Sequence, residues 1–156
     1  MRNAIKMFSL VSVLALSACG GGSSGDEVKK FVGTWHPTAG TSTTVCPGYD
    51  PFTDTLSGNL IWSRGVSSDL VDSGSSCPIM VDVNGSTASA ASGQTCTQSD
   101  GAGGSSTVTI SGYTFVIAPD GQTASENMSG NVTFIADGAT LPCTFNESGS
   151  YQKIGN

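Results

Sequence analysis

Few side chains in this 156-residue sequence could carry out acid–base or nucleophilic chemistry. His36 is the only histidine, so a Ser-His-Asp or Cys-His arrangement would have to use it. It precedes Pro37 at the end of the first expected strand, and the sequence holds no GxSxG nucleophile elbow between a strand and a helix, since GGSSG at 21–25 lies in the Gly/Ser-rich stretch. We therefore expect His36 to face solvent.

The acidic residues show no catalytic spacing either. The nearest carboxylate pairs are Asp50 with Asp54 and Asp69 with Asp72, and glycoside hydrolysis would need such a pair held across a bond. We expect these residues to form turns and meet solvent. The stretch DVNG at 82–85 resembles part of a calcium loop, but it lacks the later acidic ligand and predicts a β-turn. We expect no enzyme activity, no metal site and no cofactor.

Cys19 lies at the end of an N-terminal segment with the pattern of an export signal. Arg2 and Lys6 are positively charged, and ten mostly apolar residues follow at 7–16. A bilayer crossing takes about 20 residues, so this segment is too short to span a membrane. A charged start followed by a short apolar core is typical of a secretory signal peptide.

The residues around Cys19 resemble the lipobox of bacterial lipoproteins. The stretch LSAC at 16–19 follows the family's order of Leu, Ser or Ala, Gly or Ala, and Cys. The resemblance implies cleavage before Cys19, a diacylglyceryl thioether on its sulfur, and frequent acylation of the new amine. Several acyl chains hold a protein firmly, since each buried methylene contributes about 0.8 kcal/mol. Gly20 replaces the Asp that favours inner-membrane retention in enterobacteria, which implies the outer membrane.

These features divide the chain into three parts. Residues 1–18 are predicted to be a lipoprotein signal peptide, 19–30 the lipidated cysteine and a flexible Gly/Ser-rich tether, and 31–156 a single β-rich domain. The formal net charge of −6 argues against nucleic-acid binding, which requires clustered Lys and Arg.

The domain is predicted to be all-β because apolar residues recur with period two. Alternating runs at 56–62, 77–83, 107–111, 113–117 and 132–136 are separated by turn signals such as Asn84-Gly85 and Ser111-Gly112. The spacing predicts an antiparallel meander of about eight short strands, closed as a small barrel or packed as a sandwich.

Four cysteines remain in the expected domain, an even number in an exported chain, and we expect two disulfides. No pair forms CxxC, so neither a zinc ribbon nor a thioredoxin-like site is indicated. Three pairings are possible. A hairpin turning near Asn84-Gly85 would bring Cys77 to Cys96 and leave Cys46 for Cys143, which is the pairing we favour.

Gly33-Thr34-Trp35 resembles the G-x-W of the first strand in the lipocalin superfamily. In that family the tryptophan plugs one end of an up-and-down barrel. The family's TDY-like motif and its late basic residue near the tryptophan are not evident in the sequence. Any β domain would also place Trp35 in its core, together with Trp62.

The sequence thus favours a non-enzymatic, membrane-anchored lipoprotein of the bacterial envelope that acts as a structural or interaction module, with another envelope protein as its partner. The alternative is a lipocalin-like binder of a small apolar ligand.

Overall fold

The computed structural model describes residues 25–99, 101 and 103–156. Helix α1 (Gly25–Phe31) precedes ten strands in the described chain. Their bounds are β1 (Gly33–Val45), β2 (Phe52–Thr55), β3 (Leu60–Arg64), β4 (Leu70–Asp72), β5 (Met80–Asn84), β6 (Thr87–Ser89), β7 (Thr95–Ser99), β8 (Ser105–Ile117), β9 (Thr123–Ala136) and β10 (Ala139–Gly155). The all-β prediction is confirmed. The predicted signal peptide and Cys19 lie outside the described residues.

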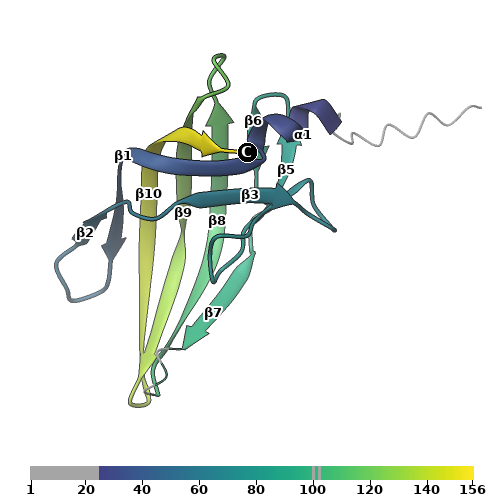
Figure 1. The fold of residues 1–156 in the computed structure, drawn as a ribbon. Helices are drawn as coiled ribbons and strands as arrows, with labels where there is room; N and C mark the ends of the chain where they lie inside the picture. The colour runs from purple at the N-terminus through teal and green to yellow at the C-terminus, as the bar shows by residue number, and fades with distance from the viewer. Residues whose placement is uncertain (1–24, 100, 102) are drawn as a thin grey trace, which may run out of the picture.

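Eight of the strands close into an antiparallel ring. The order is β10-β9-β8-β6-β5-β4-β3-β1, and β1 pairs with β10 to close it, while β2 pairs β1 and β7 pairs β8 off the ring. Four long strands form most of the wall, and β3 to β6 are short. Figure 1 shows β1 and β3 crossing in front of the upright β8, β9 and β10. The molecule is therefore a barrel whose long strands extend beyond the short ones.

The expected alternation is present, but the strands are longer than predicted. The runs at 107–111 and 113–117 belong to one strand, β8, because Ser111-Gly112 forms a bulge opposite β9 instead of a turn. The bulge keeps both halves of β8 facing inward: Ile110 on one side and Tyr113 on the other are both buried. At the other predicted turn, Asn84-Gly85, the chain does reverse between β5 and β6.

Helix α1 shortens the predicted tether, since Gly25 to Lys30 are helical. Val28 and Phe31 are buried in the core, so this segment closes one end of the barrel instead of remaining flexible. Two apolar residues three apart on a helix share a face, and that face covers the barrel end. The sequence GDEVKKF has too few apolar residues for this role to be evident without the barrel.

The closed end is filled by aromatic side chains. Trp35 and Trp62 are buried, as predicted, and each meets the ring of Phe115 edge-on, at 5.2 and 5.9 Å between centroids. Phe31 and Tyr151 pack on the same ring. Edge-to-face pairs add to the burial of large apolar area, so this cluster contributes to the hydrophobic stability of the core. We call this region, together with α1, the closed end.

Two disulfides join Cys46 to Cys143 and Cys77 to Cys96, the pairings favoured from the sequence. The first ties the end of β1 to β10. The second has a different setting from the predicted hairpin, because Cys96 lies on β7, which pairs with β8 and not with β5.

Candidate functional site

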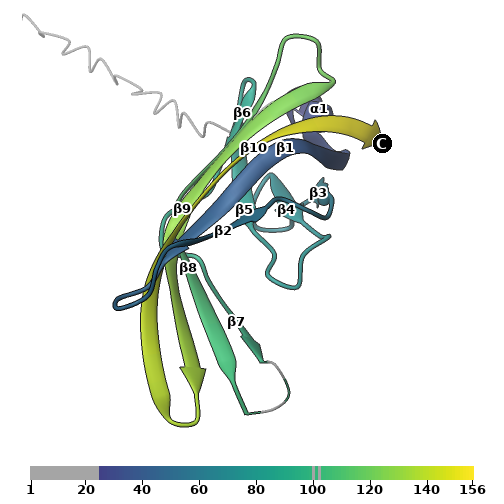
Figure 2. The same ribbon diagram turned by 90° about the vertical axis from the view of Figure 1, so that its left-hand side faces the viewer.

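The half of the barrel away from α1 is hollowed on its inner face. The short strands β3 and β6 pair only with residues 33–35 of β1 and 114–116 of β8. Beyond these pairings the long strands continue, as Figure 2 shows for β8, β9 and β10. A cavity of about 350 Å³ lies against this exposed inner face. We call it the trough.

The trough is lined mainly by apolar side chains of three adjacent strands. They are Val108 and Ile110 of β8, Met128, Val132 and Phe134 of β9, and Phe145 of β10. Ser42 and Thr44 of β1 line one side, and Ser75, Cys77 and Ile79 before β5 line the other. A concave, largely apolar surface of this volume is typical of sites for small ligands.

Strand register explains why these residues meet. Val108 pairs with Val132, which pairs with Cys143, so all three project from one face. The next pairings place Gly130 beside Phe145, and a β-carbon at Gly130 would lie 2.7 Å from the Phe145 ring. Glycine at this position therefore lets the Phe145 ring lie flat on the trough wall.

Polar groups lie at the inner end of the trough, which is the end nearest the closed end of the barrel. Met128 pairs with Tyr113 on one side and with Glu147 on the other, and Glu147 pairs with Ser42 of β1. Because cross-strand partners share a face, Glu147 projects inward between two residues that line the cavity. Burial raises the pKa of Glu147 to about 7, helped by the nearby Glu126 carboxyl and opposed by a hydrogen bond with Ser42.

Tyr113, Met128, Glu147 and Ser42 thus form a row of cross-strand partners. Behind this row is a buried polar cluster. Tyr151 Oη donates a hydrogen bond to Glu126 Oε2 at 2.5 Å. Burial raises the pKa of Glu126, while the two neighbouring tyrosine hydroxyls lower it. The Tyr113 hydroxyl is close enough to interact with this carboxyl, yet it makes no hydrogen bond of good geometry, and Trp62 Nε1 is unpaired as well. Two buried polar atoms thus face the barrel interior without a partner.

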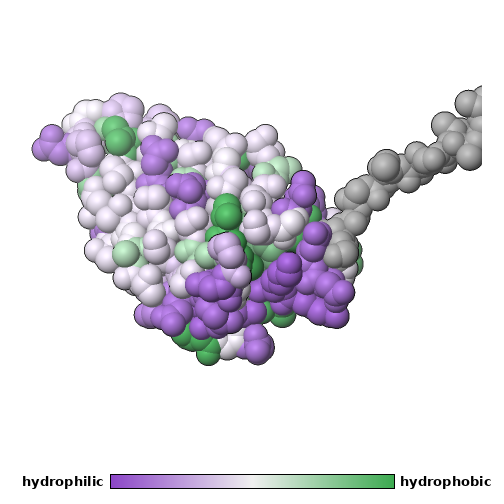
Figure 3. Space-filling model, turned by 90° about the horizontal axis from the view of Figure 1, so that it is seen from above, coloured by the Kyte–Doolittle hydropathy of each residue, from purple (hydrophilic) through white to green (hydrophobic). Residues whose placement is uncertain are grey.

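All four basic residues of the described chain lie at the closed end. Lys29 and Lys30 belong to α1, Arg64 donates to the Gly25 carbonyl, and Lys153 Nζ donates to the Lys30 carbonyl. Seen from above, hydrophilic side chains gather beside the place where the chain enters the barrel (Figure 3). The carboxylates at the inner end of the trough therefore have no basic side chain of the described residues beside them.

Lys153 has a further contact that was not evident from the sequence. Its Nζ lies 5.5 Å from the centre of the Trp35 ring, and Lys153 pairs with Trp35 across β1 and β10. Trp35 Nε1 also donates to the Phe31 carbonyl at 2.8 Å. A basic residue late in the chain thus lies over Trp35, and this contact depends on the pairing of β1 with β10.

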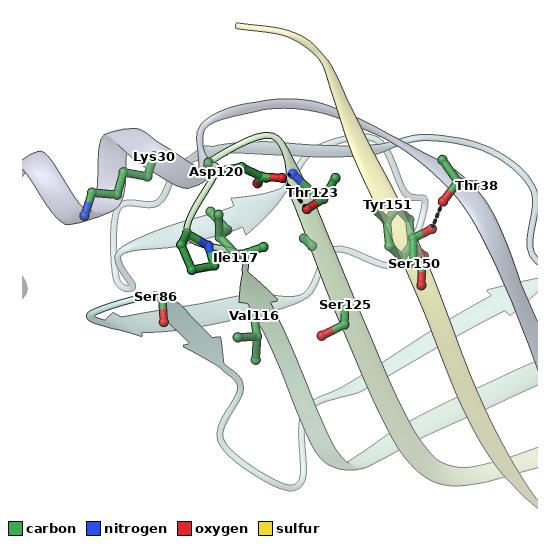
Figure 4. A pocket seen from close by; sticks show the side chains of 14 residues that line it. Lys30, Thr38, Ser86, Val116, Ile117, Asp120, Thr123, Ser125, Ser150 and Tyr151 are labelled. Carbon is green, nitrogen blue, oxygen red and sulfur yellow. Dashed lines mark hydrogen bonds between the residues drawn. The ribbon is translucent and has the colours of Figure 1, made fainter.

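A larger hollow of about 860 Å³ lies between α1 and the β8–β9 turn (Figure 4). Its lining includes Val116 and Ser125, which occupy the outward positions of β8 and β9, so much of it lies outside the barrel. Asp120 accepts hydrogen bonds from Gln122 and Thr123, which lower its pKa and hold the turn. We consider the trough the better site because its lining is mainly apolar and lies on the inner face of three adjacent strands.

The residues considered from the sequence for catalysis lie apart. His36 is exposed on β1, near its start and not its end, and its Nδ1 lies 2.9 Å from Asn59 Oδ1. Asp50 and Asp54 are exposed. Asp72 contradicts the expected solvent-facing role: it is 2 % exposed, and its Oδ1 accepts from the Ile61 and Gly74 amides.

Within residues 25–99, 101 and 103–156, no group of three or more His, Cys, Asp or Glu side chains is arranged to hold a metal ion. The described part of the chain also contains no helix with the length and apolarity needed to cross a membrane. Glu126, Glu147 and Tyr113 were missed as site residues from the sequence, where the period-two spacing placed only Tyr113 on the inner face. Comparisons with protein-family models, curated proteins and solved structures find no match.

Proposed function

We propose that this chain is a lipid-anchored protein of the bacterial envelope that binds a small apolar ligand in the trough, without catalysing a reaction on it. The observation that carries the binding proposal is the trough itself, a mainly apolar cavity on the inner face of the long strands, next to the packed core. A purely structural barrel would gain stability by filling this space, since unfilled apolar surface forfeits packing contacts.

The anchoring part of the proposal rests on the sequence around Cys19 and on the disulfides. Two disulfides are typical of an oxidising compartment outside the cytoplasm. We propose the outer membrane as the location, on the basis of Gly20. The Cys19→Ala variant should leave the membrane fraction and lose labelling by radioactive fatty acid. Continued membrane attachment with unchanged processing would contradict the proposed anchor.

Ligand binding is tested with N-phenyl-1-naphthylamine, a neutral apolar dye that fluoresces in apolar surroundings. The Cys19→Ala chain serves as the protein, since it carries no acyl groups that could bind the dye. We expect saturable binding in the micromolar range. Val108→Phe should weaken binding at least tenfold by filling the trough, because Val108 lines it.

Thr109→Phe is the matched control, since it adds a ring at the next position of β8, on the opposite face of the sheet. It should bind the dye like the parent chain. Both variants should retain the cooperative thermal transition of the folded barrel. The absence of saturable binding by the parent, or equal binding by Val108→Phe and the parent, would contradict the proposal.

A further inference from the structure

We propose that the ligand of the trough carries a protonated amine, which lies beside Glu147 while its apolar part extends along the trough. This inference rests on the proposed function and names the class of ligand. It follows from three features of the inner end: a carboxylate between cavity-lining residues, an unpaired buried hydroxyl, and the separation of all basic side chains.

The first feature is the position of Glu147. Its cross-strand partners, Met128 and Ser42, both line the cavity. Glu147 does not itself line the cavity, but it lies between two residues that do, and its side chain is only partly buried. A cation beside it would gain a charge-assisted hydrogen bond in surroundings where such bonds are stronger than in water.

The second feature is the Tyr113 hydroxyl, which lies in the same row on the other side of Met128. Tyr113 is 3 % exposed and its oxygen has no hydrogen-bond partner. A buried polar atom without a partner is unfavourable by about 1–3 kcal/mol. Tyr113 does not line the trough, and its hydroxyl lies beside the Glu126 carboxyl, so it belongs to the buried polar surroundings behind Glu147.

The third feature is charge. Glu126 and Glu147 face the interior near each other, and Asp54 of β2 lies opposite Ser42 at the exposed end of the same row. The four basic residues lie at the closed end, by α1. A ligand with a carboxylate would be repelled here, and a neutral alcohol would leave the negative charge unbalanced.

The trough also sets the size of the ligand. From Met128 to Phe134 along β9 there are six residues, which at about 3.4 Å each gives a length of about 20 Å. An unbranched ten-carbon chain fits within this length. The lining is mostly apolar, with hydroxyl groups from Ser42, Thr44, Ser75 and Ser106 and no charged side chain, so the remainder of the ligand need carry no other charge.

The test compares three ten-carbon compounds, decylamine, decanol and decanoate, as competitors of N-phenyl-1-naphthylamine at pH 8. We expect decylamine to displace the dye at a concentration at least tenfold lower than decanol, and decanoate to be weaker than decanol. In the Glu147→Gln variant, the affinity for decylamine should fall to that for decanol, while the affinity for decanol stays the same as in the parent chain. Asp50→Asn, an exposed carboxylate away from the row, should keep the preference.

The same competition experiment at lower pH is a second test. Glu126 of β9, Tyr151 of β10 and Ser42 of β1 interact with Glu147. Tyr113 of β8 and Asp54 of β2 are the next titratable groups along the same row of cross-strand partners. Protonation of Glu147 on going from pH 8 to pH 5.5 should reduce the preference for decylamine in the parent chain and leave it unchanged in Glu147→Gln.

Equal competition by decylamine and decanol in the parent chain would overturn the amine inference and leave the binding proposal standing. So would a preference for decylamine that persists in Glu147→Gln. If the dye and all three competitors fail to bind, the proposed function fails and the amine inference fails with it.

Discussion

Tyr151 Oη donates to Glu126 Oε2 inside the barrel, so a carboxyl that is 2 % exposed is held by a hydroxyl from the neighbouring strand. Buried carboxyls require such partners, because an unsatisfied polar group in the interior is strongly unfavourable. This pair joins the packed closed end to the polar inner end of the trough.

Tyr151→Phe removes the hydroxyl and leaves Glu126 with one donor fewer. We expect the free energy of unfolding to fall by about 1–3 kcal/mol, since a buried acceptor is left unpaired. Urea denaturation followed by circular dichroism measures the change. The double variant Tyr151→Phe with Glu126→Gln should recover part of the loss, because it no longer buries a charged acceptor. A single variant as stable as the parent would contradict the role assigned to the pair.

Glu147→Gln should flatten the pH dependence of stability. The folded-state pKa of about 7 lies above the ordinary value of 4.5, so the contribution of the protonated group is fully present below pH 4.5 and is lost as the pH rises through 7. For a partly buried group we expect a loss of about 1–2 kcal/mol between pH 5 and pH 8 in the parent chain. Urea titrations at the two pH values measure it.

The Glu147→Gln variant should lose less stability than the parent over this pH range. Some slope should remain, because burial raises the pKa of Glu126 in the same direction. Asp50→Asn should behave like the parent. An identical slope in Glu147→Gln and the parent would show that the Glu147 carboxyl is not held in the surroundings described above.

Part of this architecture could be predicted from the sequence and part could not. Period-two spacing placed Tyr113, Phe115 and Ile117 on the inner face, and the even cysteine count indicated two disulfides. The bulge at Ser111-Gly112 could not be distinguished from a turn, because the same residue types suit both. Its correct assignment merges two predicted strands into β8.

Contacts that depend on the pairing of distant strands could not be predicted from the sequence either. Lys153 meets Trp35 only because β10 pairs with β1 and closes the ring, and no local pattern near either residue indicates that contact. Asp72 and Glu126 were missed as interior residues because acidic side chains are seldom buried unless they have partners. Those partners come from distant strands or from turns whose geometry the sequence does not specify.

Lys153→Met tests the closed end. The change keeps most of the apolar stem but removes the contact with the Trp35 ring and the hydrogen bond to the Lys30 carbonyl. We expect a loss of about 1–2 kcal/mol from the two interactions together. Lys29→Met is the control, since Lys29 is exposed and pairs only with Asp26 on the surface. Equal stability of the two variants would contradict a closing role for Lys153.

The Cys46–Cys143 disulfide supports one wall of the trough, since both cysteines pack with Val132 and Phe145. Replacing both cysteines with serine should lower the free energy of unfolding by about 2–4 kcal/mol, because the bond closes a long loop. It should also weaken dye binding severalfold, measured by fluorescence titration well below the unfolding transition. A stable variant with unchanged dye affinity would indicate that the wall does not need this bond.

The most direct test of ligand binding in the trough is a chemical-shift titration of the methyl-labelled Cys19→Ala chain with decanol, which carries no charge. We predict saturable shifts confined to the methyl groups of Val108, Ile110, Met128 and Val132, with Val116 and Ile117 at the outer hollow unchanged. Shifts at Val116 and Ile117 with none in the trough would contradict the account, and so would the absence of any saturable shift.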